Sequence, residues 1–150
     1  MRIIESLDEL KGLIGQEVAV SDWTEITQQQ VNLFAEATGD HQWIHVDPEQ
    51  AKDGPFGTTI AHGYLTLALT NLFQPQLLEV QNISMGVNYG ANKVRFPAPV
   101  PVGSRIRGTG TITEATEIAG GVQTVVTLMV QVEGSEKPAC IVESISRWMS

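Results

Sequence analysis

The segment HGYLTLALTNLFQPQLL, residues 62–78, is the longest helix candidate in the chain and determines how the rest can pack. Its apolar side chains would cover most of the circumference of a helix. They are Leu65, Leu67, Ala68, Leu69, Leu72, Phe73, Leu77 and Leu78. A helix that is apolar nearly all round is buried inside a domain rather than laid on its surface. The pattern therefore predicts one long buried helix from His62 to about Leu78.

The chain after this helix has the alternating pattern of β-strands. Two runs carry it, Ile83, Met85, Val87 and Tyr89, and then Ile106, Gly108, Gly110 and Ile112. The pair Gly120-Gly121 is typical of a hairpin, and GSEKP, residues 134–138, indicates a further turn. Residues 105–149 are therefore expected to form a three-stranded antiparallel meander that continues an earlier sheet.

A buried helix followed by a large antiparallel sheet predicts an α+β fold in which the curved sheet wraps around the helix. No repeat, low-complexity tract or linker divides the sequence, so residues 1–150 are expected to form a single domain. A sheet of this size with one helix leaves free edges and an apolar face that need cover, so a homodimer is expected.

Composition excludes several classes of partner. Nine Lys and Arg stand against seventeen Asp and Glu, giving a net charge of −8. Such a chain repels polyphosphate, so neither nucleic acid nor an anionic membrane surface is an expected partner. The single Cys140 excludes an internal disulfide and a multi-cysteine zinc site. No signal peptide opens the chain and no segment is long and apolar enough to span a bilayer, so a cytoplasmic location is expected.

Upstream of the long helix, ITQQQVNLFAEATGD, residues 26–40, predicts a shorter amphipathic helix. Thr27 with Gln30 forms a capping box, and Gly39 is a natural stop because glycine adopts the left-handed conformation. The four residues WIHV, 43–46, are β-branched or aromatic and favour an extended chain. Asp47 and Pro48 then restart a helix as N-cap and first helical residue, before a loop at residues 54–59.

Two His and two Asp crowd into TGDHQWIHVDP, residues 38–48, in a chain with only three histidines. A metal site would use His41 and His45 at the i, i+4 spacing of a helix, but in extended chain they lie about 13 Å apart. A second interpretation is a solvated turn with no chemistry. The third is an acid–base site, which the apolar neighbours Trp43 and Ile44 favour, since burial beside a carboxylate shifts pKa values.

The tripeptide AHG, residues 61–63, stands at the start of the long helix. Backbone N–H groups lack partners there, and the helix dipole favours negative charge. Gly63 has no side chain to block a ligand from its N–H, so this N–H could stabilise a developing oxyanion. His62 by itself is more typical of a polar residue at a helix start than of a catalyst.

The segments FAEATGDHQWIH and AHG together resemble the MaoC-like (R)-specific enoyl-CoA hydratases of the hotdog fold. The residues that match are Phe34, Gly39, Asp40, Ile44, His45 and Gly63. NKVRFPAPVPVGSRI, residues 92–106, also resembles that family's strand and turn after the helix, so the resemblance covers nearly the whole chain. It implies a hotdog fold, with a long central helix wrapped by a curved antiparallel sheet.

The resemblance also implies roles for the site residues. Asp40 and His45 would hold a water that attacks C3 of a trans-2-enoyl thioester, and the same pair would supply a proton to C2. The Gly63 N–H would stabilise the enolate oxygen. No metal and no cofactor are expected, and the substrate would be an acyl-CoA thioester.

The sequence departs from the family pattern at two positions. Gln42 stands where the family has Asn, which lengthens the reach of the amide, and Trp43 stands where it has Pro, which adds bulk. GDHQWIH is similar to the nodulation-protein-N-like branch. Gln42, Trp43 and His62 are expected to contact the substrate, while Lys93 and Arg95 are candidates for its nucleotide or, alternatively, solvated edge charges.

The expected activity is hydration of a trans-2-enoyl-CoA to the (R)-3-hydroxyacyl-CoA, or the reverse dehydration, by a hydro-lyase of the enoyl-CoA hydratase 2 type. Three alternatives stay open. A hotdog acyl-CoA thioesterase would use Asp40 to activate water against the thioester carbonyl. A non-catalytic acyl-thioester binding protein would need neither Asp40 nor His45 for its role, and a metal-dependent hydrolase would require an ion.

Overall fold

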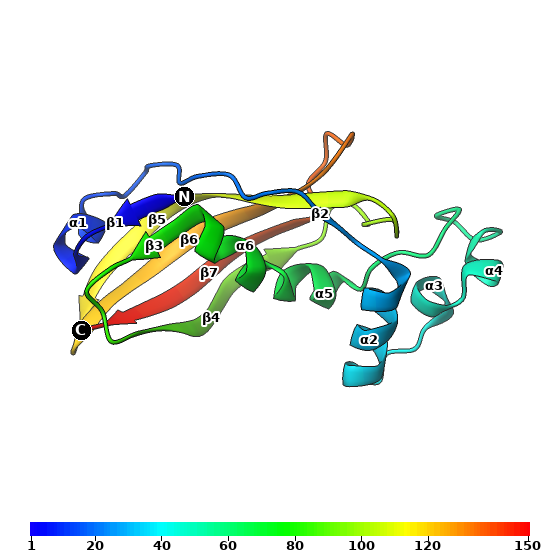
Figure 1. Cartoon of the computed structure of the whole chain (residues 1–150), viewed down its shortest axis with the longest axis horizontal. Coiled ribbons are helices and arrows are strands. Elements are labelled where there is room, and N and C mark those ends of the chain that lie inside the picture. The colour runs from blue at the N-terminus through cyan, green and yellow to red at the C-terminus, as the bar shows by residue number, and fades with distance from the viewer.

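A computed structural model describes all 150 residues of the chain, in which a curved antiparallel sheet packs around a central helical segment (Figure 1). The elements run in the order β1 (Arg2–Ile4), α1 (Leu7–Lys11), β2 (Thr24–Glu25), α2 (Gln28–Thr38), α3 (Trp43–Val46), α4 (Pro48–Ala51), α5 (Gly63–Ala68), α6 (Thr70–Leu77), β3 (Leu78–Val80), β4 (Met85–Arg95), β5 (Arg105–Ile118), β6 (Gly121–Val132) and β7 (Cys140–Met149).

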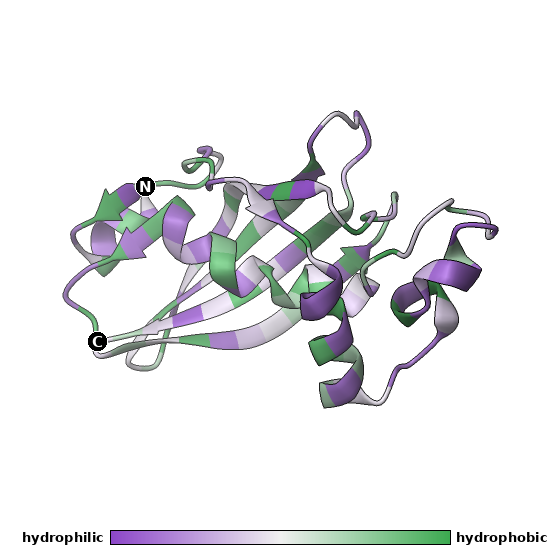
Figure 2. Ribbon diagram, turned by 45° about the vertical axis from the view of Figure 1, so that its right-hand side comes forward, coloured by the Kyte–Doolittle hydropathy of each residue, from purple (hydrophilic) through white to green (hydrophobic).

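The meander predicted for residues 105–149 is confirmed. Strands β5, β6 and β7 pair antiparallel in sequence order, and the five-stranded sheet has the order β2-β5-β6-β7-β4. The turn between β5 and β6 uses Gly120 at φ 78°, a conformation that glycine adopts without strain. Hydrophobic and hydrophilic residues alternate along these strands (Figure 2). In β5 the alternating residues Ile106, Gly108, Gly110 and Ile112 are buried.

The long helix predicted from His62 to Leu78 is interrupted. Leu69 separates α5 from α6, and the chain enters β3 at Leu78. The hydroxyl of Thr70 donates to the carbonyl of Leu67 over 2.7 Å, a side-chain bond that competes with the helical ladder and bends helices. Pro75 lies inside α6 and removes one further backbone donor.

The prediction that this helix is buried all round is wrong for the single chain. Leu65, Phe73 and Leu77 face the sheet and are buried, whereas Tyr64 is 72% exposed and Leu72 is 45% exposed. The physical reason is that the sheet covers the helix from one side only. The opposite face of α5 and α6 is apolar and open in the isolated chain.

Close packing between α6 and β5 sets the position of the central helix. A Cβ atom on Gly108 would lie 2.7 Å from the Cβ of Phe73, so only glycine allows the helix to approach this closely. Phe73 is 1% exposed and belongs to a core of 22 buried residues. At the other end of the molecule, helices α2, α3 and α4 project beyond the sheet (Figure 1). No helix is long and apolar enough to cross a membrane.

Candidate active site

The predicted capping signals place Asp40 directly after α2. The hydroxyl of Thr27 accepts from the backbone N–H of Gln30, and Gly39 ends the helix at φ 85° with its N–H bonded to the carbonyl of Ala35. This left-handed residue turns the chain sharply, as expected. Asp40 follows at an exposed position, where its carboxylate accepts from the backbone N–H of Gln42 over 3.3 Å.

The prediction that residues 43–46 are extended is wrong, because they form the single helical turn α3. Tertiary contacts override the β-propensity of WIHV. The backbone N–H of Ile60 donates to the carbonyl of Ile44, and the ring of Trp43 lies so close to Gly54 that a Cβ there would meet it at 2.9 Å. The predicted start of α4 is confirmed, since Asp47 caps it and Pro48 is its first residue.

His45 is held in one orientation by the segment that precedes α5. It is 6% exposed, and its Nδ1 lies 2.7 Å from the carbonyl oxygen of Ile60. A carbonyl only accepts, so Nδ1 carries the proton and Nε2 keeps its lone pair. Burial lowers the pKa of His45, and the nearby His62 lowers it further, while the bond to Ile60 and the charge of Asp40 act in the opposite direction. The net shift is downward, so the imidazole is neutral at pH 7.

His62 lies against His45. The two rings are stacked, with centroids 3.9 Å apart and planes inclined by 23°. The ring of Phe34 also packs against His62, with centroids 4.9 Å apart. The Nε2 of His62 lies 2.9 Å from the backbone carbonyl oxygen of Asp40. His62 is 3% exposed, and its Nδ1 is the only buried side-chain polar atom without a hydrogen-bond partner.

One side-chain nitrogen or oxygen from each of Asp40, His45 and His62 lies within 4.8 Å of the others. His41, which the sequence offers as a metal ligand with His45, is exposed and outside this cluster. A shared ion needs lone pairs that converge on one point, as in tetrahedral zinc sites. Each imidazole already bonds one backbone carbonyl, His45 that of Ile60 and His62 that of Asp40, so one nitrogen of each ring remains available for proton transfer or for a ligand.

Gly63 begins α5, and its backbone N–H donates to no group of the protein. The carbonyl of His62 accepts instead from the N–H groups of Leu65 and Thr66. The ring of Phe96 packs so close to Gly63 that a Cβ there would lie 3.1 Å from it. A free donor therefore lies next in sequence to the buried His62, with an aromatic ring beside it.

The other expected substrate residues lie outside this cluster. Gln42 is exposed, precedes α3 and makes no side-chain cap. Trp43 is half-buried on α3. Lys93 and Arg95 are exposed on β4, on either side of the half-buried Val94, and neither bonds to the cluster.

Gln28 is a site residue that sequence reasoning missed. Its amide nitrogen donates to the carbonyl of His45 over 2.7 Å, and its amide oxygen accepts from the hydroxyl of Thr59 over 2.5 Å. It therefore ties α2 to α3 and to the segment before α5. The sequence carries no signal for this, because Gln28 also reads as an ordinary first-turn residue of an amphipathic helix.

The chain is similar to several known proteins. Residues 9–134 match the family described as MaoC like domain. The chain is 56% identical over 151 residues, covering all of both chains, to 3-hydroxyacyl-thioester dehydratase Z of Mycobacterium tuberculosis. It is 42% identical over 137 residues to nodulation protein N of Rhizobium meliloti, covering 89% of this chain and 85% of that protein.

Among solved structures, the unliganded R-hydratase PhaJ1 of Pseudomonas aeruginosa superposes with a TM-score of 0.73 at 23% identity. The match covers 97% of this chain and 86% of that one. The likeness confirms the hotdog fold that the sequence predicts.

The histidine geometry yields a prediction that needs no substrate. Imidazole ¹H–¹⁵N spectra across a pH titration should show an Nδ1–H tautomer for His45 and a pKa below the ordinary value of about 6.5. Because the unfolded chain then binds the proton more readily, the free energy of unfolding should fall as pH drops from about 6.5 toward the folded pKa. A His41→Gln variant assigns the resonances, and an Nε2–H tautomer for His45 would contradict the geometry.

Proposed function

The chain belongs to the MaoC-like domain family, and on that premise we propose that it is a hydro-lyase acting on acyl thioesters. It adds water to a trans-2-enoyl-CoA to give the (R)-3-hydroxyacyl-CoA, or runs the reverse dehydration. The observation that carries this proposal is the cluster of Asp40 with the neutral, oriented His45, beside the free N–H of Gly63. The dehydratase name of the M. tuberculosis relative supports the reaction class.

Asp40 and His45, called the dyad below, deliver both the hydroxyl and the proton of one water molecule to the substrate. A water held between Asp40 and His45 gives up a proton to the dyad, and its oxygen forms the new bond to C3. The electron pair of the C2–C3 double bond moves toward the thioester, forming an enolate, which then takes a proton at C2 from the same dyad. One water is consumed and no redox change occurs. His45 suits this role because its Nε2 lone pair is free while Nδ1 is anchored.

The enolate oxygen is stabilised at the start of α5. Gly63 offers an N–H with no acceptor in the protein, and a donor aimed at developing charge lowers the barrier most when it is already in place. Any larger residue at position 63 would push against the ring of Phe96. We assign the acyl-CoA nucleotide to Lys93 and Arg95, the two cations of β4.

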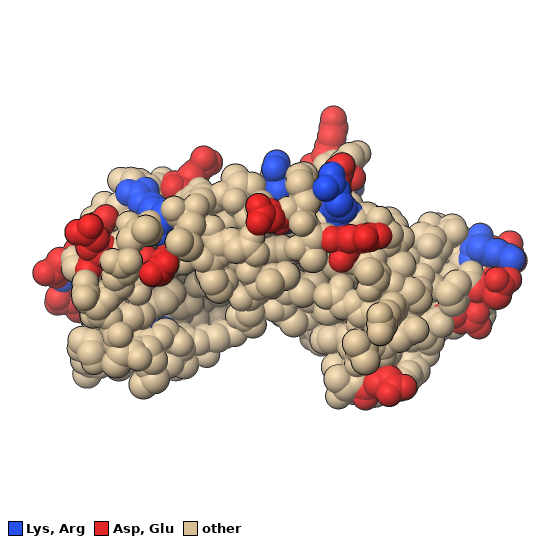
Figure 3. All heavy atoms as spheres, viewed as in Figure 1, with Lys and Arg blue, Asp and Glu red and all other residues tan.

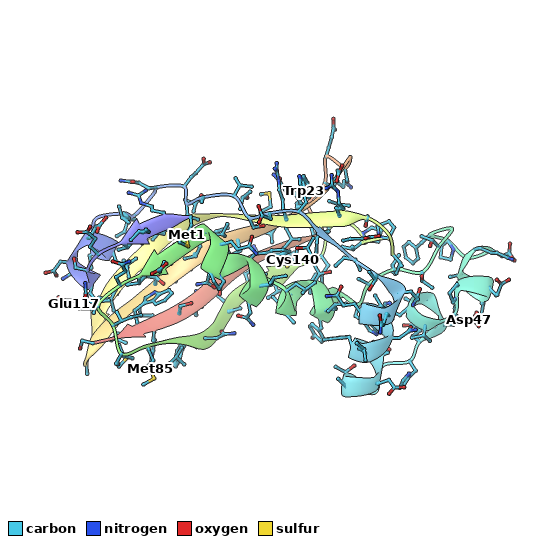
Figure 4. All side chains as sticks on the ribbon, in the orientation of Figure 1. Met1, Trp23, Asp47, Met85, Glu117 and Cys140 are labelled. Atoms are coloured by element: carbon cyan, nitrogen blue, oxygen red, sulfur yellow. The ribbon has the colours of Figure 1, made fainter.

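We also propose a homodimer formed through β4. This strand has an unpaired edge, and its residues Met85, Val87 and Tyr89 are 57%, 40% and 56% exposed. Met85 points outward at this border of the molecule (Figure 4). The lower middle of the same view carries no charged side chains, whereas the charged side chains gather in the upper half and toward the two ends (Figure 3). A free strand edge with exposed apolar side chains is suited to a second copy of the chain.

The reaction is tested by the loss of enoyl absorbance when the protein meets crotonyl-CoA. Asp40→Asn and His45→Gln should each lower kcat by about 10²- to 10⁴-fold, because each removes one partner of proton transfer. Asp53→Asn, an exposed carboxylate in the same projecting region, serves as the matched control and should retain full activity. Release of free thiol in place of hydration would instead establish a thioesterase, and full activity in either dyad variant would refute the assignment.

Light scattering tests the dimer. The wild-type protein should have twice the 16.3 kDa mass of one chain at micromolar concentration. Val87→Glu places a charge in the middle of the free edge and should shift the protein toward monomer, whereas Thr111→Glu, on β5 away from that edge, should not. A monomeric wild type, or a Val87→Glu variant that stays dimeric, would count against an interface at β4.

A further inference from the structure

His62 stacks on His45 but takes no part in the chemistry proposed above. We propose that His62 is a positioning residue, which holds the backbone of Asp40 and the ring of His45 in the reactive arrangement. The proposal rests on the hydratase function proposed above and adds to it the group that orients the dyad. His62 is 3% exposed, and its ring contacts His45, Phe34 and the backbone carbonyl of Asp40.

The first contact fixes Asp40. A backbone carbonyl only accepts, so the Nε2 of His62 must carry the proton that bonds the carbonyl of Asp40 over 2.9 Å. The other hydrogen bonds of Asp40 are longer, at 3.4 Å to the hydroxyl of Thr38 and 3.3 Å from the backbone N–H of Gln42. Asp40 is exposed just after the end of α2, so the bond from His62 is its firmest tie to the start of α5.

The second contact fixes His45. The hydrogen bond to Ile60 holds one edge of the ring but by itself leaves the ring free to tilt about that bond. His62 covers one face of the ring at a centroid distance of 3.9 Å and is backed in turn by Phe34. The stack therefore determines the direction of the Nε2 lone pair, and small misplacements of a catalytic group cost large factors in rate.

The Nδ1 of His62 is buried without a hydrogen-bond partner, and its ring stacks on the imidazole of His45. The titratable groups that act on His45 are Asp40, from the loop after α2, and His62, at the start of α5. Removing His62 therefore removes one influence that keeps His45 neutral at low pH.

Two variants separate the contacts of His62. His62→Phe keeps an aromatic ring for the stack but loses the donor, and His62→Gln keeps a donor near the position of Nε2 but loses the stack. With crotonyl-CoA, His62→Phe should lower kcat by about 10- to 100-fold while KM changes less than about threefold. His62→Gln should recover part of that loss. In both variants the acidic limb of the kcat profile should move to higher pH.

Several outcomes would overturn the proposal. A large rise in KM with unchanged kcat and an unmoved acidic limb would make His62 a substrate-binding residue, and wild-type kinetics in both variants would leave it no role. Imidazole spectra of the wild type test the same geometry even if a variant fails to fold, since an Nδ1–H tautomer of His62 refutes the bond to Asp40. These spectra and the pKa of His45 in the variants are measured without substrate and therefore test the positioning role of His62 alone. An inactive wild-type protein would refute the hydratase function separately.

Discussion

The hydrogen bond from Nδ1 of His45 to the carbonyl of Ile60 is the interaction on which the site depends. It joins the projecting turn α3 to the segment that leads into α5, and the two bonded residues are fifteen positions apart in the sequence. The same bond buries the imidazole, fixes its tautomer and leaves Nε2 as a free base. Gln28 reinforces it from α2 by holding the backbone of His45. Together with the bond from His62 to the carbonyl of Asp40, this junction brings Asp40 to the start of α5.

The junction works because the central helix is fixed on its other side. Gly108 allows Phe73 to sit directly on β5, and this close approach anchors α6 within the curved sheet. The start of α5 is then presented at the end of the sheet where α2 and α3 project (Figure 1). The glycines of this protein thus serve two purposes. Gly108 admits the helix, and Gly63 leaves a backbone donor uncovered.

Features determined by neighbouring residues could be predicted from the sequence. Thr27 and Gly39 delimit α2, Asp47 and Pro48 begin α4, and the meander follows from alternation and its glycine turns. Features that depend on distant contacts could not. Residues 43–46 have the composition of a strand and become helical only because Ile60 and Gln28 bind their backbone. The exposed face of α5 and α6 was likewise unpredictable, since burial there depends on what the sheet leaves uncovered.

The candidate site was predictable in its residue types but not in its connections. Asp40, His45 and Gly63 are indicated by the resemblance to the MaoC-like family, whereas the stack of His62 on His45 joins residues seventeen positions apart and leaves no periodic signal. Gln28 is hidden for the same reason, because a bridging amide resembles any polar residue on a helix. Long-range hydrogen bonds of this kind are determined by the fold as a whole.

In the proposed mechanism, one dyad delivers both the hydroxyl and the proton of a single water. The most direct test is to hydrate crotonyl-CoA in D₂O and determine by NMR the configuration of the product at C2 and C3. Because the proposed mechanism has Asp40 and His45 act from one side of the substrate, we expect a single diastereomer, formed by syn addition and of (R) configuration at C3. A mixture of configurations at C2, or anti addition, would show that the proton comes from elsewhere and would contradict the shared dyad.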